Sequence, residues 1–216
     1  MAIVAKICGL RTEDAVQAAV AGGARYVGFV CYPPSPRHIA FHEAEKLAAL
    51  VPPHVLRVGL FVDPSDDLLG EWLEGGALDM LQLHGAESAK RVARIREIAE
   101  LPVMKAVRVA TREDVEQAIS VYGPVVDRLM FDATPLADDP QALPGGNGVP
   151  FDWRILEGVT VPKPWMLSGG LTPENVAAAV QATGAKAVDV SSGVESTRGV
   201  KSVERIKAFL AATAKL

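Results

Sequence analysis

The sequence predicts an α/β protein folded as a single (β/α)8 TIM barrel, and three observations support this fold class. The chain has 216 residues, 49% of them hydrophobic, which suits one domain with a sizeable core. Short apolar runs alternate with helical patterns, as in successive βαβ units. The runs are almost wholly apolar, as expected for parallel strands covered on both faces. We therefore expect one domain over residues 1–216.

Eight apolar or β-branched runs are predicted to be strands, each bounded by turn or helix signals. They cover residues 3–7, 26–30, 57–62, 79–83, 103–107, 128–131, 164–167 and 187–190. An open doubly wound sheet is the alternative architecture. No G-x-G-x-x-G pattern follows the first strand, which counts against that alternative.

Helical patterns occupy most of the intervals between these runs. They cover residues 12–21, 41–50, 88–98, 112–120, 173–182 and 201–214. Thr12 precedes two acidic residues and is expected to cap the first helix. Pro173 is expected at the first helical position of its segment, where its missing N–H is not needed.

Composition and charge narrow the class of partner. The net charge is -4 with a pI near 5.6, and no basic stripe or basic amphipathic helix appears, which argues against nucleic acid and membrane surfaces as partners. No apolar run approaches the roughly 18 residues needed to span a bilayer, and no signal-peptide pattern is present. We expect a cytoplasmic protein that binds a small molecule. Cys8 and Cys31 are expected to be free thiols.

Two proton-transfer groups lie at the ends of predicted strands. Asp132 ends the apolar segment 128–132, and Cys8 ends the first strand. Functional groups of a (β/α)8 barrel collect at the carboxyl ends of its strands, so this pair predicts an acid and a base facing each other across the barrel mouth. The alternative readings are an aspartate that caps a loop and a cysteine that serves as a small core residue.

The last two strands lead into loops suited to a phosphate group. Gly169 and Gly170 allow a tight turn and a close approach of the backbone to a ligand. Ser191, Ser192 and Gly193 offer backbone N–H groups after the eighth strand. Loops after strands seven and eight often bind phosphate in such barrels, although a glycine pair can also be a simple turn.

Taken in order, the motifs of the chain resemble those of the phosphoribosylanthranilate isomerase family. The resemblance covers nearly the whole chain and rests on Lys6-Ile7-Cys8-Gly9-Leu10, residues 33–37 ending in Arg37, Gln82-Leu83-His84-Gly85, Phe131-Asp132-Ala133, residues 145–153, Ser168-Gly169-Gly170-Leu171 and residues 189–195.

The resemblance implies an aldose–ketose isomerase of tryptophan biosynthesis that performs an Amadori rearrangement without cofactor or metal. It implies that Asp132 is the general acid and Cys8 the general base. Lys6, on the same strand face as Cys8, is expected to favour the thiolate. Arg37 is expected to bind the anthranilate carboxylate through paired hydrogen bonds. His84 and Asp189 are expected as further substrate contacts, or as satisfied polar groups at strand ends.

Other readings remain open at this point. Another phosphosugar barrel, of the indole-glycerol-phosphate synthase or epimerase type, is the alternative enzyme, and a barrel that binds a phosphoribosyl ligand without catalysis is the alternative outside enzymes. The cysteines and histidines match no zinc spacing, so no metal is expected. The segment 134–150 is too long for an ordinary loop and is expected to fold over the ligand. We expect a monomer or a homodimer.

Overall fold

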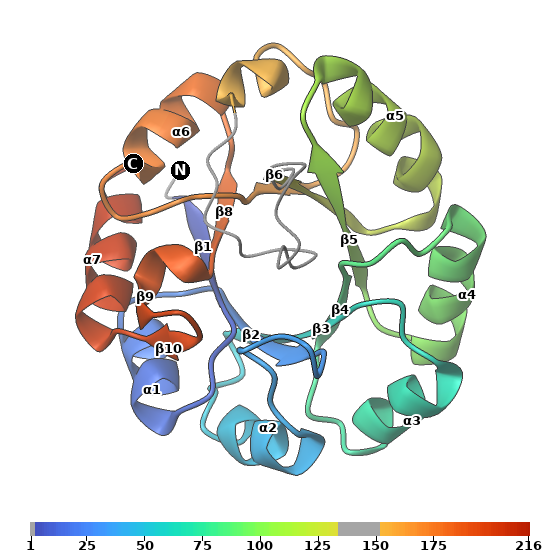
Figure 1. Cartoon of the computed structure of the whole chain (residues 1–216), viewed down its shortest axis with the longest axis vertical. Coiled ribbons are helices and arrows are strands. Elements are labelled where there is room, and N and C mark those ends of the chain that lie inside the picture. Colours follow the sequence, from blue (N-terminus) through green and yellow to red (C-terminus); the bar gives the residue numbers. More distant parts are fainter. Residues whose placement is uncertain (1–2, 134–151) are drawn as a thin grey trace.

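The computed structural model describes residues 3–133 and 152–216. Within these residues, eight parallel strands close into a barrel in chain order, with the last strand paired to the first (Figure 1). The strands are β1 (Val4–Cys8), β2 (Tyr26–Cys31), β3 (Leu56–Phe61), β4 (Met80–Leu83), β5 (Val103–Val109), β6 (Arg128–Ala133), β7 (Trp165–Leu167) and β8 (Ala187–Val190). The closed ring confirms the predicted (β/α)8 barrel and rules out the open doubly wound sheet.

The α-helices surround the ring of strands on the outside (Figure 1). They are α1 (Glu13–Ala21), α2 (Phe41–Ala48), α3 (Asp66–Glu74), α4 (Ala89–Ala99), α5 (Arg112–Tyr122), α6 (Val176–Thr183) and α7 (Val203–Thr213). Several begin at a capping side chain: the hydroxyls of Ser65, Ser88, Thr111 and Ser202 each accept a hydrogen bond from a backbone N–H in the first turn. None of the helices in the described ranges is long and apolar enough to cross a membrane.

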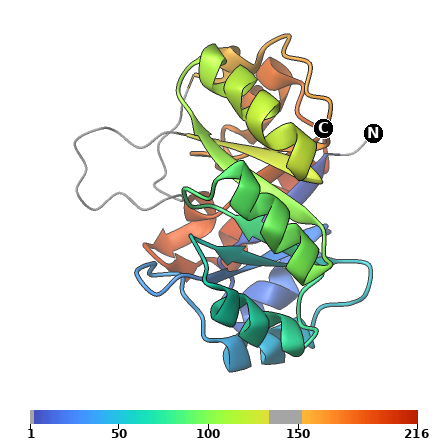
Figure 2. The same cartoon turned by 90° about the vertical axis from the view of Figure 1, so that its right-hand side faces the viewer.

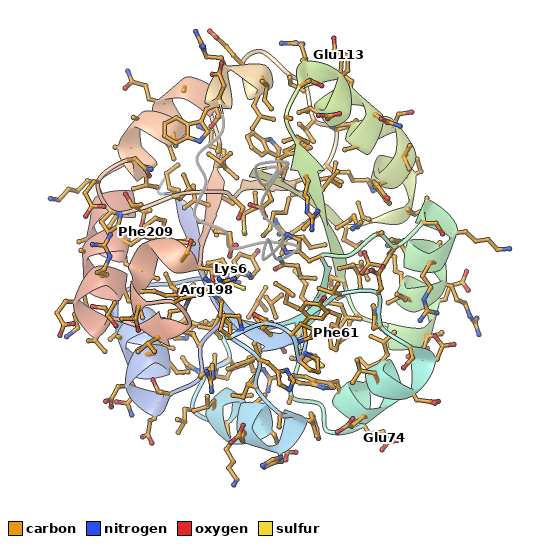
Figure 3. The ribbon with its side chains drawn as sticks, viewed as in Figure 1. Lys6, Phe61, Glu74, Glu113, Arg198 and Phe209 are labelled. Atoms are coloured by element: carbon orange, nitrogen blue, oxygen red, sulfur yellow. The ribbon has the colours of Figure 1, made fainter. Side chains whose placement is uncertain are left out.

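Apolar side chains of the described residues fill three regions: one between the strands and the helices, an inner one within the barrel near the amino-terminal ends of its strands, and a small one of Cys8, Val30 and Leu60. Phe61 and Phe209 belong to the first region, whereas Glu74 and Glu113 lie at the outer rim and Lys6 lies within the ring (Figure 3). The inner region is formed by Tyr26, Val58, Met80, Met104, Ala106, Met130, Met166 and Ala187. These residues close the barrel below the polar groups at its mouth, so the barrel is a packed core with one polar end.

The structure corrects two predicted helix starts. Helix α6 begins at Val176, because Thr172 and Pro173 belong to a turn that precedes it. Helix α7 begins at Val203, because Lys201 belongs to a short antiparallel hairpin formed by β9 (Glu195–Thr197) and β10 (Val200–Lys201). This hairpin lies at the end of the barrel opposite the C-terminus of the chain (Figure 2).

Candidate active site

Lys6 lies in the middle of β1 and Cys8 at its carboxyl end, and both side chains point to the inside of the barrel. The Lys6 ammonium donates a hydrogen bond to Asp189 Oδ1 at 2.8 Å, and Asp189 Oδ2 accepts one from the Ser168 hydroxyl at 3.3 Å. Lys6 has no solvent exposure and Asp189 only 5%. Strands β7, β8 and β1 therefore contribute one buried polar cluster beside the Cys8 thiol.

The electrostatics of this cluster act on the thiol in opposite directions. Burial raises the pKa of the Cys8 thiol, and the charge of Asp189 adds to that increase, whereas Lys6 lowers it. Burial alone would lower the pKa of Lys6, but Asp189 and Cys8 together raise it above the usual value. Lys6 therefore stays an ammonium and lowers the pKa of the Cys8 thiol, which is the direction expected from the sequence. Burial raises this pKa by more, so the net shift is upward.

Space for Cys8 and Lys6 depends on Gly28 in the neighbouring strand. A Cβ atom at Gly28 would lie 2.9 Å from Cys8 Sγ and 3.2 Å from Lys6 Nζ. Gly28 pairs with Cys8 in the register of β1 and β2. A glycine inside a strand often marks such a close approach, and this was the available signal for a residue that the sequence analysis did not single out.

Asp132 lies at the carboxyl end of β6 and is paired with a histidine. His84 Nε2 is 3.1 Å from Asp132 Oδ2, and His84 Nδ1 is 3.1 Å from Nε2 of Gln82. All three side chains are buried, with Gln82 fully enclosed. The structure thus places His84, expected as a substrate contact, against the predicted acid.

The loop after β4, which carries His84, is held from behind by a buried ion pair. Lys105 Nζ lies 2.9 Å from Glu87 Oε2 and donates a hydrogen bond to the carbonyl of Gly85 at 2.8 Å. Glu87 in turn accepts hydrogen bonds from the backbone N–H groups of Gly85 and Asp63. This arrangement fixes the loops after β3 and β4, so Lys105 and Glu87 are supporting residues that the sequence analysis missed.

Arg37 is held in a second buried ionic cluster near the β9–β10 hairpin. Its Nε and Nη2 atoms donate to the two carboxylate oxygens of Glu195 at 2.7 and 3.0 Å. Lys201 donates to Glu195 Oε1 at 2.7 Å and to the carbonyl of Ser191 at 2.8 Å. Although burial opposes the change, hydrogen bonds from Arg37 and the charge of Lys201 lower the pKa of Glu195 to about 2. The Nε and Nη2 atoms of Arg37 are thus already paired with a carboxylate, that of Glu195.

The glycine-rich loops after β7 and β8 pack directly on each other. Gly169 and Gly170 have φ values of +89° and +64°, a region that favours glycine. A Cβ atom at Gly193 would lie 1.8 Å from the carbonyl oxygen of Leu171, so no side chain fits there. The Ser191 hydroxyl donates to the Cys8 carbonyl at 3.2 Å, which ties this double loop to the end of β1.

A pocket of about 330 Å³ opens on the other side of the mouth, over the ends of β3, β4 and β5. Its lining includes Tyr32, Val62, His84 and Arg108. In the part of the chain that the structure describes, no group of three or more His, Cys, Asp or Glu residues could hold a metal ion. The segment 134–150, expected to fold over the ligand, lies outside the described residues.

The predicted site residues fall into three groups around one barrel end. Cys8 and Asp189 lie in the cluster with Lys6, and Asp132 lies with His84. Arg37 and the serines and glycines of the last two loops lie at the mouth. Cys31 is separate, because it packs in the core outside the barrel; burial raises the pKa of its thiol to about 12.

Fold and site define a class of protein: a (β/α)8-barrel enzyme with ionisable groups at the carboxyl ends of its strands. The sequence pattern of the N-(5'phosphoribosyl)anthranilate (PRA) isomerase family matches residues 5–212. The chain belongs to this family, which confirms the prediction of an isomerase made from the sequence motifs. The alternative phosphosugar barrels and the non-catalytic binder are not favoured.

Relatives of known name and structure agree with this assignment. An N-(5'-phosphoribosyl)anthranilate isomerase of Paracoccus denitrificans is 54% identical over 211 residues, which cover 98% of this chain and 97% of that protein. One from Rhodospirillum centenum is 52% identical over the full length of both. The crystal structure of phosphoribosyl anthranilate isomerase from Thermotoga maritima is 33% identical, with a TM-score of 0.87 and coverage of 99% of this chain and 100% of that one.

Proposed function

We propose that this chain converts N-(5'-phosphoribosyl)anthranilate into 1-(o-carboxyphenylamino)-1-deoxyribulose 5-phosphate, with Asp132 as general acid and Cys8 as general base. The observation that carries the assignment is the placement of these two groups on the inner wall at the same end of the barrel. A solved relative, 33% identical with a TM-score of 0.82, was crystallised with reduced 1-(o-carboxyphenylamino)-1-deoxyribulose 5-phosphate, which supports this substrate class.

The rearrangement needs one proton donor and one proton acceptor. Asp132 donates its proton to the ring oxygen of the ribose, the bond between that oxygen and C1 breaks, and the nitrogen lone pair forms a protonated Schiff base. Cys8, as thiolate, removes the proton from C2, and the electron pair moves to the nitrogen to give an enolamine. Tautomerisation of the enolamine gives the ketone. Residues positioned for such transfers typically contribute roughly 10²- to 10⁴-fold each.

The availability of the thiolate follows from the charges around Cys8. Since burial raises the pKa of this thiol, the thiolate is the less populated form at neutral pH. Lys6 opposes this effect and stays charged because it is paired with Asp189. Asp189 therefore acts on the base through Lys6 and also remains a predicted substrate contact.

Binding of the two ends of the substrate is assigned to different loops of the mouth. The positive φ values at Gly169 and Gly170 and the tight packing of Gly193 support a phosphate site made by the loops after β7 and β8, with the backbone N–H groups of Ser191, Ser192 and Gly193 as donors. Arg37 is assigned to the anthranilate carboxylate. Glu195 accepts hydrogen bonds from the Nε and Nη2 atoms of Arg37 and so holds the guanidinium in place at the mouth.

The test is the rate of isomerisation of freshly generated phosphoribosylanthranilate, followed by loss of its fluorescence. Cys8→Ser and Asp132→Asn should each lower kcat by at least roughly a hundredfold, the scale of a lost acid or base. Cys31→Ser and Asp127→Asn are matched controls, because Cys31 packs outside the barrel and Asp127 caps the opposite end of β6. Controls that lose as much as the site variants, or site variants that keep wild-type kcat, would overturn the assignment.

The oligomeric state and the cellular compartment of the protein are also proposed. We assign residues 1–216 to one catalytic domain, in the cytoplasm, as a monomer or a homodimer. A solved relative, 33% identical, is described as a monomer generated from the dimeric enzyme of Thermotoga maritima. Light scattering of the full chain over a concentration series distinguishes the two states, and larger assemblies would contradict both.

A further inference from the structure

A chain of three buried side chains leads to the predicted acid. Gln82 and His84 project from alternate positions of β4 and the loop that follows it, and Asp132 projects from β6. Gln82 Nε2 lies 3.1 Å from His84 Nδ1, and His84 Nε2 lies 3.1 Å from Asp132 Oδ2. Each ring nitrogen of His84 thus has one defined neighbour.

The glutamine amide determines which ring nitrogen carries the hydrogen. An amide nitrogen only donates, so Nδ1 of His84 must present its lone pair to Gln82. A neutral imidazole with its lone pair on Nδ1 carries its hydrogen on Nε2. His84 therefore donates through Nε2 to Oδ2 of Asp132.

The orientation of the amide is set by its other neighbours. The Gln82 amide nitrogen also lies 3.4 Å from the sulfur of Met130, a weak acceptor. The reverse orientation would place the carbonyl oxygen against the sulfur lone pairs. In the orientation present, Oε1 of Gln82 is buried without a hydrogen-bond partner among the described residues. A buried, unsatisfied oxygen is unfavourable, so the orientation rests on the two contacts of the amide nitrogen, with His84 and Met130.

We propose that Gln82 and His84 are positioning residues that set the proton geometry of Asp132, an inference that rests on Asp132 being the general acid. Because Oδ2 accepts a hydrogen bond from His84, the transferable proton of Asp132 is carried by Oδ1. When that proton moves to the substrate, Asp132 becomes a carboxylate and the hydrogen bond from His84 becomes charge-assisted. Such bonds are roughly twice as strong as neutral ones, so the relay stabilises the state reached after proton transfer.

Other charged groups near this relay are left unchanged in the test. Arg108 lies beside Asp132 in the register of β5 and β6. Lys6 and Asp189 form their own pair on β1 and β8. Lys105, on the outward face of β5, is held by Glu87. The variants below change none of these groups.

The kinetic test compares variants that remove the His84 donor, replace it with an amide donor, or remove it when its acceptor Asp132 is already changed. His84→Leu should lower kcat roughly 10- to 100-fold, the range for losing a hydrogen bond to a charged group, with KM changed less than about threefold. His84→Gln, whose amide can donate to Oδ2, should recover several-fold of that loss. In the Asp132→Asn background, His84→Leu should cause no further loss of kcat. His54→Gln, in the exposed connection between α2 and β3, is the control.

A spectroscopic test does not depend on activity. Nitrogen-15 chemical shifts of labelled histidine should show His84 with its hydrogen on Nε2 in the wild-type protein. Gln82→Met, which removes the amide donor at similar size, should shift the tautomer balance, and Gln82→Glu should move a hydrogen to Nδ1. His54 should be unchanged in both variants.

The outcomes separate this inference from the proposed function. If Asp132→Asn keeps wild-type kcat, the assignment of the acid fails. If Asp132→Asn is inactive but folded His84→Leu stays within about threefold of wild-type kcat, the relay is wrong while the acid stands. A hydrogen on Nδ1 of His84 in the wild-type protein would also overturn the relay. Unfolding of His84→Leu leaves the decision to His84→Gln and the nitrogen-15 shifts.

Discussion

Substitution of Gly28 by alanine should impair the proposed base, Cys8, while the barrel stays folded. The added Cβ would lie 2.9 Å from Cys8 Sγ, at least about 0.6 Å inside the optimal heavy-atom contact range of roughly 3.5–4.0 Å. The same Cβ would lie 3.2 Å from the Cys8 Cα and from Lys6 Nζ, so backbone and ammonium limit the relief. The thiol must therefore move by several tenths of an ångström.

Such a displacement acts more strongly on catalysis than on stability. A misplacement of roughly 1 Å can lower the rate about a hundredfold, so we expect Gly28→Ala to lose roughly 10- to 100-fold in kcat. Overpacking costs typically about 1–3 kcal/mol, partly offset by the smaller entropy of the unfolded alanine variant. Steady-state kinetics and urea unfolding on the same preparation measure the two effects.

Gly70→Ala provides the matched control for this experiment. Gly70 lies in α3 and a Cβ there would meet no atom within 4 Å. Alanine should stabilise that helix by roughly 0.8–1 kcal/mol and leave kcat unchanged. If folded Gly28→Ala keeps kcat within about threefold of wild type, the reasoning that the thiol must be held against Gly28 is refuted.

Three further predictions concern charge and loop packing. Lys6→Met is made together with Asp189→Asn, to avoid an unpaired buried carboxylate, and is compared with Asp189→Asn alone. The pKa of Cys8 should be higher in the double variant, because the cation that opposes the effect of burial is gone. Alkylation rates measured against pH should differ between the two proteins, and coinciding profiles would contradict this. The pKa of Glu195 is lowered to about 2 on folding, so its ion pairs stabilise the protein above pH 4.5, and this contribution is lost as pH falls from 4.5 toward 2. The difference in unfolding free energy between wild type and Glu195→Gln, measured with urea, should therefore shrink over that pH window. A constant difference would rule out the linkage. Gly193→Ala should push the loop after β8 away from the Leu171 carbonyl. We expect KM to rise about tenfold or more, which corresponds to a loss of roughly 1.4 kcal/mol in binding. An unchanged KM together with unchanged inhibition by inorganic phosphate would show that Gly193 is not part of the proposed phosphate site.

The alternation of apolar runs and helical patterns was sufficient to predict the barrel, because parallel strands covered on both faces need continuous apolar sequence. The boundaries of β8 agree with the prediction, and each of the other strands differs by one or two residues at one or both ends. The start of α7 was misplaced because the β9–β10 hairpin is too short to produce a period of its own. Pro173 was misplaced because a proline favours a turn as readily as a helix start.

The site could be predicted as a set of positions but not as a set of pairs. Strand alternation places Lys6 and Cys8 on one face, and Gln82 and His84 on another. It does not determine which groups meet across the barrel, since that depends on strand register. The pairing of His84 with Asp132 is of this kind. The ion pair between Arg37 and Glu195, 158 positions apart, also could not be derived from local sequence.

The predicted base sits on the seam where the barrel closes. Lys6 meets Asp189 across β1 and β8, and the Cys8 carbonyl meets the Ser191 hydroxyl, in each case 183 positions apart along the chain. These are among the least local contacts of the fold, and bringing such distant segments together carries the largest loop-closure entropy. Recovery of activity during refolding should therefore follow the joining of the first and last strands, so that catalysis itself reports when the ring is complete.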